Sequence, residues 1–315
     1  MHNKRSRIVV VGSYAVGMTM SCARFPTSGE TVKGSNFKPL HGGKGSNQAI
    51  AVARLGGQAV FGSCVGVDQF GDSALEMLSR EGIDTSYVKR SPAFSTGVGF
   101  VIVDQSGHNE IVIDLGANED LDKPDMDAMA GAIQQSNLLL VQLETNLGAV
   151  IRAMELASAA GVPIILNPAP FQKLPERVVK MASFITPNET EAMAMLGLEG
   201  QKMLDGKELA RELHRKFGVT AVVTLGHNGA HIVSTEVDQR LPAYDTTVKD
   251  TTGAGDTFSA AMAVALGEGK SIVDAVDFAN KAAGHSVAVD GVVESIPTRN
   301  AVDNSTLQRK KQGTA

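Results

Sequence analysis

The segment Asp-Thr-Thr-Gly-Ala-Gly-Asp-Thr occupies residues 250–257, and a run of small residues follows it at 258–266. Gly253 and Gly255 permit backbone angles that other residues rarely adopt, so successive N–H groups can face one centre where a helix begins. Such a centre binds an anion. The carboxylate of Asp256 stands at its edge, where the positive helix end favours the ionised form and leaves it able to accept a proton. The segment therefore indicates phosphoryl transfer.

A simpler interpretation of the same segment stays open. Glycine-rich turns that only begin a helix are common. A capping Asp would bind backbone N–H groups two or three residues further along the chain. A second glycine-rich segment at residues 42–49 and an acidic helix start at residues 188–191 favour the chemical interpretation.

Composition narrows the class of protein. The 315 residues are 43% hydrophobic and 20% charged, which predicts one or two α/β domains with a sizeable core. A net charge of −5, with a basic block only at residues 309–311, argues against nucleic acid and favours small-molecule ligands. Cys22 and Cys64 show neither a disulfide framework nor zinc-ligand spacing. Without a signal or membrane-span pattern, we expect a cytoplasmic protein with no membrane partner.

Short β-branched runs alternate with segments of helical period. The expected strands cover residues 8–11, 60–65, 138–143, 163–166, 184–186 and 221–224. The expected helices cover residues 46–55, 71–81, 147–160, 189–196 and 206–217. This alternation predicts a mainly parallel sheet with helices on both faces, and ligands beyond the carboxyl ends of its strands.

Two segments break the alternation, at residues 18–37 and 97–115, the second with a turn at 105–109. We expect antiparallel strands that pair into a small β-sheet lid. The predicted core comprises residues 1–12, 38–92 and 116–304, the lid residues 13–37 and 93–115, and a flexible tail residues 305–315. Because an exposed sheet invites pairing, we expect a homodimer through the lid.

The second glycine-rich segment, Gly-Gly-Lys-Gly-Ser-Asn-Gln-Ala at residues 42–49, leads into a predicted helix. It is not a Walker A loop, because a glycine follows the lysine. A bare turn would need the glycines but neither a cation nor an amide. Lys44 and Asn47 are typical of side chains that hydrogen-bond a polyhydroxylated ligand.

Together with four shorter motifs in the same order, these two segments resemble the ribokinase (PfkB) family of carbohydrate kinases. The shorter motifs lie at residues 142–145, 166–170, 186–191 and 224–226, and the resemblance runs from residue 8 to about 297. It implies a ribokinase-like three-layer αβα fold with a mainly parallel central sheet and a small β-sheet lid. It also implies transfer of the γ-phosphate of ATP to a sugar hydroxymethyl group, with Mg²⁺ and an activating K⁺.

The resemblance also implies a role for individual residues. Asp256 would take the proton of the sugar hydroxyl, and the N–H groups of Gly253, Ala254 and Gly255 would stabilise the transferring phosphoryl group. The sugar contacts would be Gly43, Lys44, Asn47, Glu144 and Asp256. The nucleotide contacts would be Asn188, Thr224, Gly226 and Asn280. Glu191 and Asn188 would bind Mg²⁺, partly through water, and the monovalent cation would lie among Asp250, Thr252, Ser286, Val289, Gly291 and Ser295.

Structural alternatives remain for several of these residues. Asn188 and Glu191 have the spacing of a helix capping box. Glu144 at a strand end could pair with a basic neighbour. Thr224 and Gly226 also fit an ordinary turn.

The chain departs from the family pattern at one place. In the ribokinases that this chain resembles, the first strand is followed by Gly-Ser-x-Asn-x-Asp. This chain has Ala15 and Gly17 at the two polar positions of that pattern. Each lost hydrogen bond to a buried hydroxyl costs about 1–3 kcal/mol, enough to change the preferred sugar. The alternatives to a ribose-like pentose or related furanose are a nucleoside, a ketohexose, or a sugar- or nucleotide-binding sensor with weak turnover. A dinucleotide-dependent oxidoreductase is disfavoured, because Gly-x-Gly-x-x-Gly does not follow the first strand.

Overall fold

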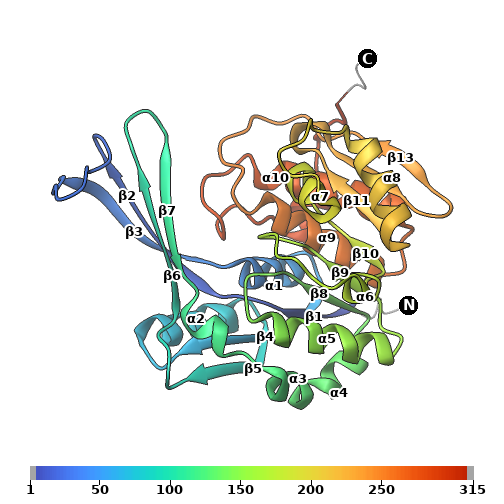
Figure 1. Cartoon of the computed structure of the whole chain (residues 1–315), viewed down its shortest axis with the longest axis horizontal. Coiled ribbons are helices and arrows are strands. Elements are labelled where there is room, and N and C mark those ends of the chain that lie inside the picture. The colour runs from blue at the N-terminus through green and yellow to red at the C-terminus, as the bar shows by residue number, and fades with distance from the viewer. Residues whose placement is uncertain (1–4, 311–315) are drawn as a thin grey trace.

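The computed structural model describes residues 5–310 and shows an α/β core with a lid that projects from one end (Figure 1). The core sheet has nine strands in the order β13-β12-β11-β10-β9-β8-β1-β4-β5. Neighbours from β11 to β5 pair in parallel, while β12 and β13 add an antiparallel edge. The strands are β1 (Arg7–Val11), β4 (Gln58–Gly66), β5 (Asp84–Ser91), β8 (Leu138–Val141), β9 (Ile164–Leu166), β10 (Phe184–Ile185), β11 (Thr220–Thr224), β12 (Ala230–Val233) and β13 (Asp238–Leu241).

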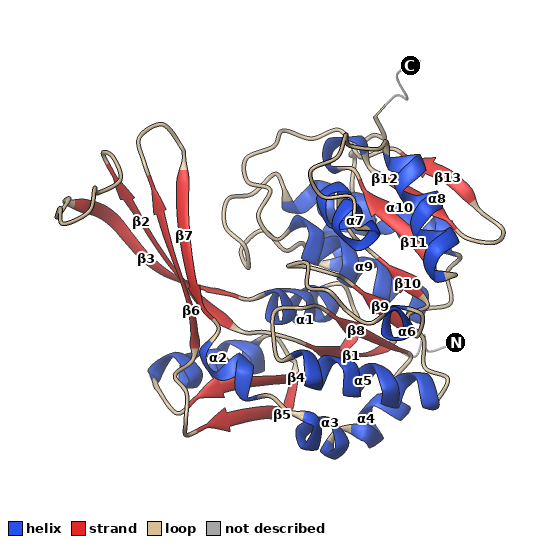
Figure 2. Cartoon of the chain, viewed as in Figure 1, coloured by secondary structure: helices blue, strands red, loops and turns tan. Residues whose placement is uncertain are grey.

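Helices cover both faces of this sheet (Figure 2). One face carries α3 (Lys123–Ala128), α4 (Ala130–Gln134), α5 (Leu147–Ala159), α6 (Glu176–Val179), α7 (Glu189–Leu196) and α8 (Gly206–Phe217). The other carries α1 (Lys44–Arg54), α2 (Gln69–Arg80), α9 (Ala254–Gly267), α10 (Ile272–Ser286) and α11 (Arg299–Asp303). In the described part of the chain, no helix combines the length and apolar composition of a membrane span.

The central strand β1 explains why the core has two apolar layers. Its side chains alternate between the faces, so Ile8 packs into the cluster with α1 and α9, and Val9 into the cluster with α5. All four apolar residues of β1 are buried, as expected for a strand covered on both sides. The expected three-layer fold with a mainly parallel sheet is confirmed.

The lid is a four-stranded sheet in the order β3-β2-β6-β7. Its strands are β2 (Ala15–Cys22), β3 (Gly34–Gly42), β6 (Gly97–Val103) and β7 (Asn109–Asp114). Each hairpin is antiparallel as predicted, but β2 and β6, which join the hairpins, run parallel. The predicted boundary also shifts, because β3 continues to Gly42 and so takes residues 38–42 from the core into the lid.

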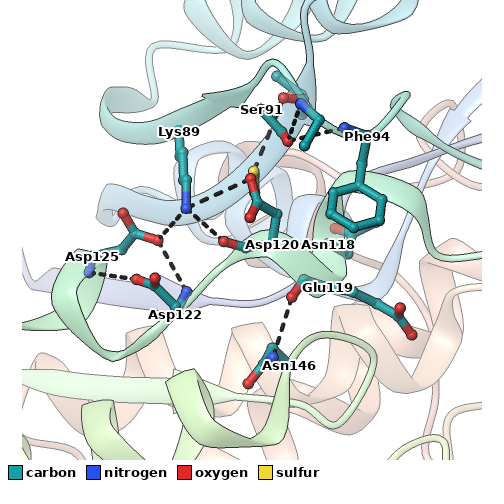
Figure 3. A network of polar contacts seen from close by, with 12 residues as sticks. Lys89, Ser91, Phe94, Asn118, Glu119, Asp120, Asp122, Asp125 and Asn146 are labelled. Carbon is teal, nitrogen blue, oxygen red and sulfur yellow. Dashed lines mark hydrogen bonds and ion pairs between the residues drawn. The ribbon is translucent and has the colours of Figure 1, made fainter.

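A polar network attaches the base of the lid to the core. The Asn118 side chain, in the short helix η1 (Gly116–Asp120), accepts from Tyr14 N at 2.9 Å and donates to Tyr14 O at 2.8 Å. Lys89 Nζ donates to Asp120 O at 2.6 Å and pairs with Asp125 at 3.1 Å (Figure 3). Because η1 is bound on both sides, the start of β2 has a fixed position relative to the core.

The C-terminal segment differs from expectation. Residues 305–310 are not a loose tail: Asp245 N donates to Gln308 O and Lys310 N to Ala243 O, both at 2.8 Å. Arg309 also pairs with Asp277 at 2.8 Å. Backbone pairing and an ion pair offset the conformational entropy that would otherwise leave this polar segment frayed. Residues 311–315 of the predicted tail lie outside the described residues.

We expect Arg54→Met to destabilise the fold, because Arg54 connects α1 to two distant segments. Its guanidinium pairs with Glu81 through two bonds, at 2.9 and 2.6 Å, and donates to Val293 O at 2.6 Å and Ile296 O at 3.0 Å. Loss of these half-buried bonds should lower the free energy of unfolding by about 2 kcal/mol in urea titrations. Arg80→Met removes an exposed pair with Glu76 and should cost less than about 0.5 kcal/mol. Equal losses would contradict this account.

Candidate active site

Asp256 lies in the first turn of α9, with its side chain directed at α1. It is 6% exposed. Asn47 Nδ2 donates to Oδ2 at 2.9 Å, and Gln48 Nε2 donates to Oδ1 at 3.1 Å. Each carboxylate oxygen therefore has an amide donor, which a buried charge requires. The sequence predicted Asp256 and Asn47 in one site and missed Gln48.

The two amides belong to a larger buried network. Gln48 Nε2 also donates to Asn167 Oδ1 at 3.0 Å, and Gln48 Oε1 accepts from Gln142 Nε2 at 2.5 Å. Asn167 Nδ2 donates to Thr186 O at 3.1 Å. Gln142, Asn167 and Thr186 directly follow β8, β9 and β10, so the network crosses the carboxyl edge of the sheet where ligands bind in such folds.

Lys44 lies among three carboxylates. Burial raises the pKa of Asp256, against the opposing effects of the Lys44 charge and the two amide donors. Burial likewise raises the pKa of Glu191. For Lys44 burial acts to lower the pKa, but the charges of Asp256, Glu144 and Glu191 outweigh it and the pKa is raised. One cation thus partly compensates three acids gathered from three distant parts of the chain.

A cavity of about 220 Å³ brings seven of the predicted site residues together, while the predicted sugar contacts Gly43, Asn47 and Glu144 are not among its lining residues. Its lining includes Lys44, Asn188, Glu191, Thr224, Gly253, Gly255 and Asp256, together with Asn167, Ala169, Thr186 and Thr251. Side chains from both glycine-rich segments and from the Asn-x-x-Glu motif therefore face one space. We call this space the smaller cavity, because a larger one adjoins it. It has the donors, the cation and the carboxylate that a phosphoryl group and its acceptor require.

The backbone at the start of α9 presents two of the three predicted N–H groups without a protein acceptor among the described residues. Gly253 adopts a left-handed conformation with φ 74° and caps the helix. Among residues 5–310, no acceptor bonds the N–H groups of Gly253 and Gly255. The Ala254 N–H instead donates to Thr251 O at 3.2 Å, because the turn at Gly253 folds it back on that carbonyl. The role of the Ala254 N–H toward a phosphoryl group therefore stays a prediction.

A larger cavity of about 590 Å³ adjoins the smaller one. It is lined by the predicted residues Thr224, Gly226 and Asn280, and by Ala243, Tyr244, Phe258 and Gly284. Thr224, Thr251 and Gly255 line both cavities, so the two meet beside the start of α9. Asn188, predicted with the nucleotide residues, lines only the smaller cavity.

Glu144 binds the segment that begins α1. Its Oε2 accepts from Ser13 Oγ at 2.6 Å and from Lys44 N at 2.8 Å. Gly43 has φ 93°, and a Cβ there would lie 2.8 Å from Ala15 N, so glycine is required at this close approach. These contacts place Gly43, Lys44 and Glu144 beside the start of the lid strand β2.

Asn188 and Glu191 form the capping box that the sequence left open. Glu191 N donates to Asn188 Oδ1 at 2.8 Å, and Asn188 N donates to Glu191 Oε2 at 2.9 Å. Within residues 5–310, no three His, Cys, Asp or Glu side chains cluster as metal ligands. A metal here would bind one carboxylate and one amide oxygen, a set that suits Mg²⁺ with retained waters and phosphate ligands.

The predicted monovalent-cation residues lie on the loop before α9, and on the end of α10 with the loop that follows it. Asp250 Oδ1 accepts from Thr252 N and Oγ1, and Oδ2 accepts from Gly291 N at 3.2 Å. Burial acts to raise the pKa of Asp250, but these hydrogen bonds lower it overall, so the carboxylate stays charged. Ser295 Oγ donates to Val292 O, and Val289 is largely exposed. Ser286 Oγ is buried and lacks a partner among the described residues.

This chain is similar to one family model and to several known proteins. Residues 5–299 match the model of the pfkB family carbohydrate kinases. The ribokinase of Haemophilus influenzae is 38% identical over 94% of this chain and 96% of its own length. The deoxyribokinase of Salmonella typhi is 33% identical over 92% of this chain and 95% of its own. The structure of Arabidopsis thaliana ribokinase complexed with ribose and ATP has a TM-score of 0.87 and 30% identity, covering 95% and 98% of the two chains.

We expect Asp256→Asn to stabilise the folded protein at neutral pH. Burial raises the pKa of Asp256 in the folded state above its ordinary value of 3.8, so the folded state binds the proton more tightly. The resulting stabilisation is complete below that value and is lost as the pH rises through the folded pKa. Asn at this position carries no charge, and Asn47 can turn its unpartnered Oδ1 toward the new amide.

Urea unfolding at about pH 4 and about pH 7.5 measures this effect. The variant should exceed the unmodified protein in stability at the higher pH, and the difference should shrink toward the lower pH. Glu76→Gln, which neutralises an exposed carboxylate, should show no such change. A variant less stable than the unmodified protein at about pH 7.5 would refute the raised pKa that burial gives this carboxylate.

Proposed function

This chain belongs to the pfkB family of carbohydrate kinases, phosphotransferases that act on an alcohol group, and we propose that it transfers the γ-phosphate of ATP to a sugar hydroxymethyl group. The observation that carries the proposal is the smaller cavity, where the Asp256 carboxylate and the N–H groups of Gly253 and Gly255 share one space. The larger cavity, which meets it at Thr224 and Gly255, has room for the nucleotide.

In the proposed reaction Asp256 accepts the proton of the attacking hydroxyl. The hydroxyl oxygen forms a bond to the γ-phosphorus as the bond from that phosphorus to the β,γ-bridging oxygen breaks, and ADP leaves with the electron pair. Burial, which raises the pKa of Asp256, brings its basicity closer to the working pH and makes proton transfer more favourable. Asn47 and Gln48 orient the carboxylate before the acceptor arrives.

The charge on the transferring phosphoryl group would be stabilised by two backbone donors and a lysine. Gly253 and Gly255 provide N–H groups at the positive end of α9. The Lys44 ammonium also lines this cavity. Pre-positioned donors of this kind stabilise the transition state without reorganisation during the reaction.

We propose Mg²⁺ at Asn188 and Glu191, partly through water, where it would neutralise charge between the nucleotide phosphates. The support is that both side chains line the smaller cavity from the start of α7. We propose K⁺ beside Asp250 and Thr252, facing Ser286 at the end of α10 and Val289, Gly291 and Ser295 on the loop that follows it. The lowered pKa of Asp250 and the Ser286 Oγ, which has no partner within residues 5–310, support this second site.

The lid bears on the choice of acceptor. Val16 and Met18 pack against Val65 and Ala74 of the core, so alternation along β2 places Ala15 and Gly17 on the opposite face. A Cβ on Gly17 would meet no atom closer than Leu40 O at 3.7 Å. This face therefore has space and no hydrogen-bonding side chain at either position. We propose a furanose acceptor bulkier or less polar than ribose on its lid side, with a nucleoside or ketohexose as the alternative.

We also propose that two copies associate through their lids. Phe100, Ile111, Val112 and Ile113 are 47%, 53%, 70% and 56% exposed on strands β6 and β7. Exposed apolar sheets of this kind favour pairing with another sheet.

We propose that the protein works in a reducing compartment such as the cytoplasm. The two cysteines support this, because both are free.

Asp256→Asn tests the proposed base. Turnover with the preferred acceptor should fall by roughly 10²- to 10⁴-fold, because the amide cannot accept the proton. ATP affinity by calorimetry should not fall, since Asp256 lines only the smaller cavity and its proposed role is toward the acceptor hydroxyl rather than the nucleotide. Asp303→Asn, at an exposed carboxylate outside both cavities, is the control and should retain full activity. Undiminished turnover in Asp256→Asn would remove the proposed base from the reaction.

A panel of acceptors tests the substrate proposal. ADP release should be measured with pentoses, ketohexoses, sugar acids and nucleosides, each in K⁺ and in Na⁺ buffers. We expect a substituted furanose or nucleoside to exceed ribose in kcat/KM, and K⁺ to raise the rate. The double variant Ala15→Asn, Gly17→Asp should shift preference toward ribose by roughly tenfold or more, as two restored hydrogen bonds imply. A strong preference for ribose in the unmodified protein would contradict the inference drawn from Ala15 and Gly17. Binding of a sugar or nucleotide without phosphoryl transfer would instead support the alternative of a binding sensor.

A further inference from the structure

The C-terminal strap, residues 305–310, runs along a wall of the larger cavity. It follows α11 and pairs antiparallel with residues 243–245, through Lys310 N to Ala243 O and Asp245 N to Gln308 O. Ala243 and Tyr244 both line the cavity, and so does Lys310 of the strap itself. The strap is therefore part of the cavity wall.

Specific contacts fix the strap to α10. Arg309 Nη2 pairs with Asp277 at 2.8 Å, and Arg309 Nε donates to Tyr244 OH at 3.4 Å. The Tyr244 hydroxyl donates to the same Asp277 carboxylate at 3.2 Å. This contact to Asp277 raises the pKa of Arg309, so the guanidinium stays charged. The Arg309–Asp277 ion pair, together with the Tyr244 hydroxyl that contacts both side chains, fixes the position of Arg309, the neighbour of Lys310 in the strap.

Packing adds a second attachment. Gly284 of α10 lines the larger cavity, and a Cβ there would lie 3.3 Å from Tyr244 Cβ and 3.7 Å from Leu307 Cδ1. Tyr244 and Leu307 thus approach the backbone of α10 closely. The strap, the segment at residues 243–245 and α10 form one packed side of the cavity.

The charge at this wall has no counterion in the cavity. Of the described residues that line it, Lys310 is the one Lys or Arg, and none is Asp or Glu. An uncompensated cation in a concave site attracts a polyanion and raises its local concentration. The nucleoside triphosphate assigned to this cavity is such a polyanion.

We propose that the C-terminal strap is part of the nucleotide site, with Lys310 binding the triphosphate nucleotide and Arg309 positioning the strap. The inference rests on the proposed function, because it takes ATP as the ligand of the larger cavity. Lys310 acts by charge, and Arg309 acts through Asp277 and Tyr244 on the position of Lys310.

Full-length variants separate the two roles. Lys310→Met should raise the Kd and KM for ATP by roughly three- to tenfold, and leave kcat and the KM for the acceptor within about twofold. Its affinity for adenosine, which has no phosphate, should be unchanged. Lys310→Arg should restore ATP affinity. Arg309→Met should weaken both ATP and adenosine, because the wall itself loosens.

Salt dependence and a matched lysine complete the test. The difference in ATP affinity between Lys310→Met and the unmodified protein should narrow as ionic strength rises. Lys207→Met, an exposed lysine on α8, is the control and should bind ATP normally. If the unmodified chain binds ATP and Lys310→Met binds it equally well, the inference alone fails. If the unmodified chain binds no ATP, the proposed function fails with it.

Discussion

The structure depends on one buried carboxylate and the two amides that satisfy it. Asp256 of α9 accepts from Asn47 and Gln48 of α1, so both oxygens of a nearly inaccessible charge have donors. Without them the ionised side chain would carry an uncompensated desolvation cost. Gln48 in turn binds Gln142 and Asn167, which extends the constraint to the ends of β8 and β9. Even Gly12 is fixed by it, since a Cβ there would lie 1.8 Å from Gln142 Oε1.

The same helix connects the carboxylate to the lid. Strand β3 ends at Gly42 and α1 begins at Lys44, so Gly43 alone separates the lid from the helix that orients Asp256. Glu144 accepts from the Lys44 N–H at this junction and from Ser13, which lies between β1 and the lid strand β2. The base of the lid is anchored again through Asn118 and Tyr14. The lid and the helix that orients Asp256 are therefore joined by a short stretch of backbone, which suits the proposed reaction because that reaction depends on position.

Local signals were enough for part of this structure. Helices α7 and α8 begin and end at the predicted residues, where Asn188 and Asp205 cap one end and Gly197 and Gly218 the other. Asn167 and Asn188 line one cavity because they follow the parallel strands β9 and β10, whose carboxyl ends share an edge of the sheet. Gln48 and Gln142 lie 94 residues apart and no local pattern links them. The acceptor of the Ala254 N–H could not be predicted, because it depends on the turn at Gly253. The order of the C-terminal strap could not be predicted either, because its hydrogen-bond partners lie far away in the sequence.

The most direct test of the account is a structure of the protein with the preferred acceptor and a non-hydrolysable ATP analogue. We predict the acceptor hydroxyl within about 3 Å of the Asp256 carboxylate and in line with the γ-phosphorus. The γ-phosphate oxygens should lie against the N–H groups of Gly253 and Gly255. A complex in which the hydroxyl is directed away from Asp256, with that carboxylate bonded only to Asn47 and Gln48, would contradict the central claim.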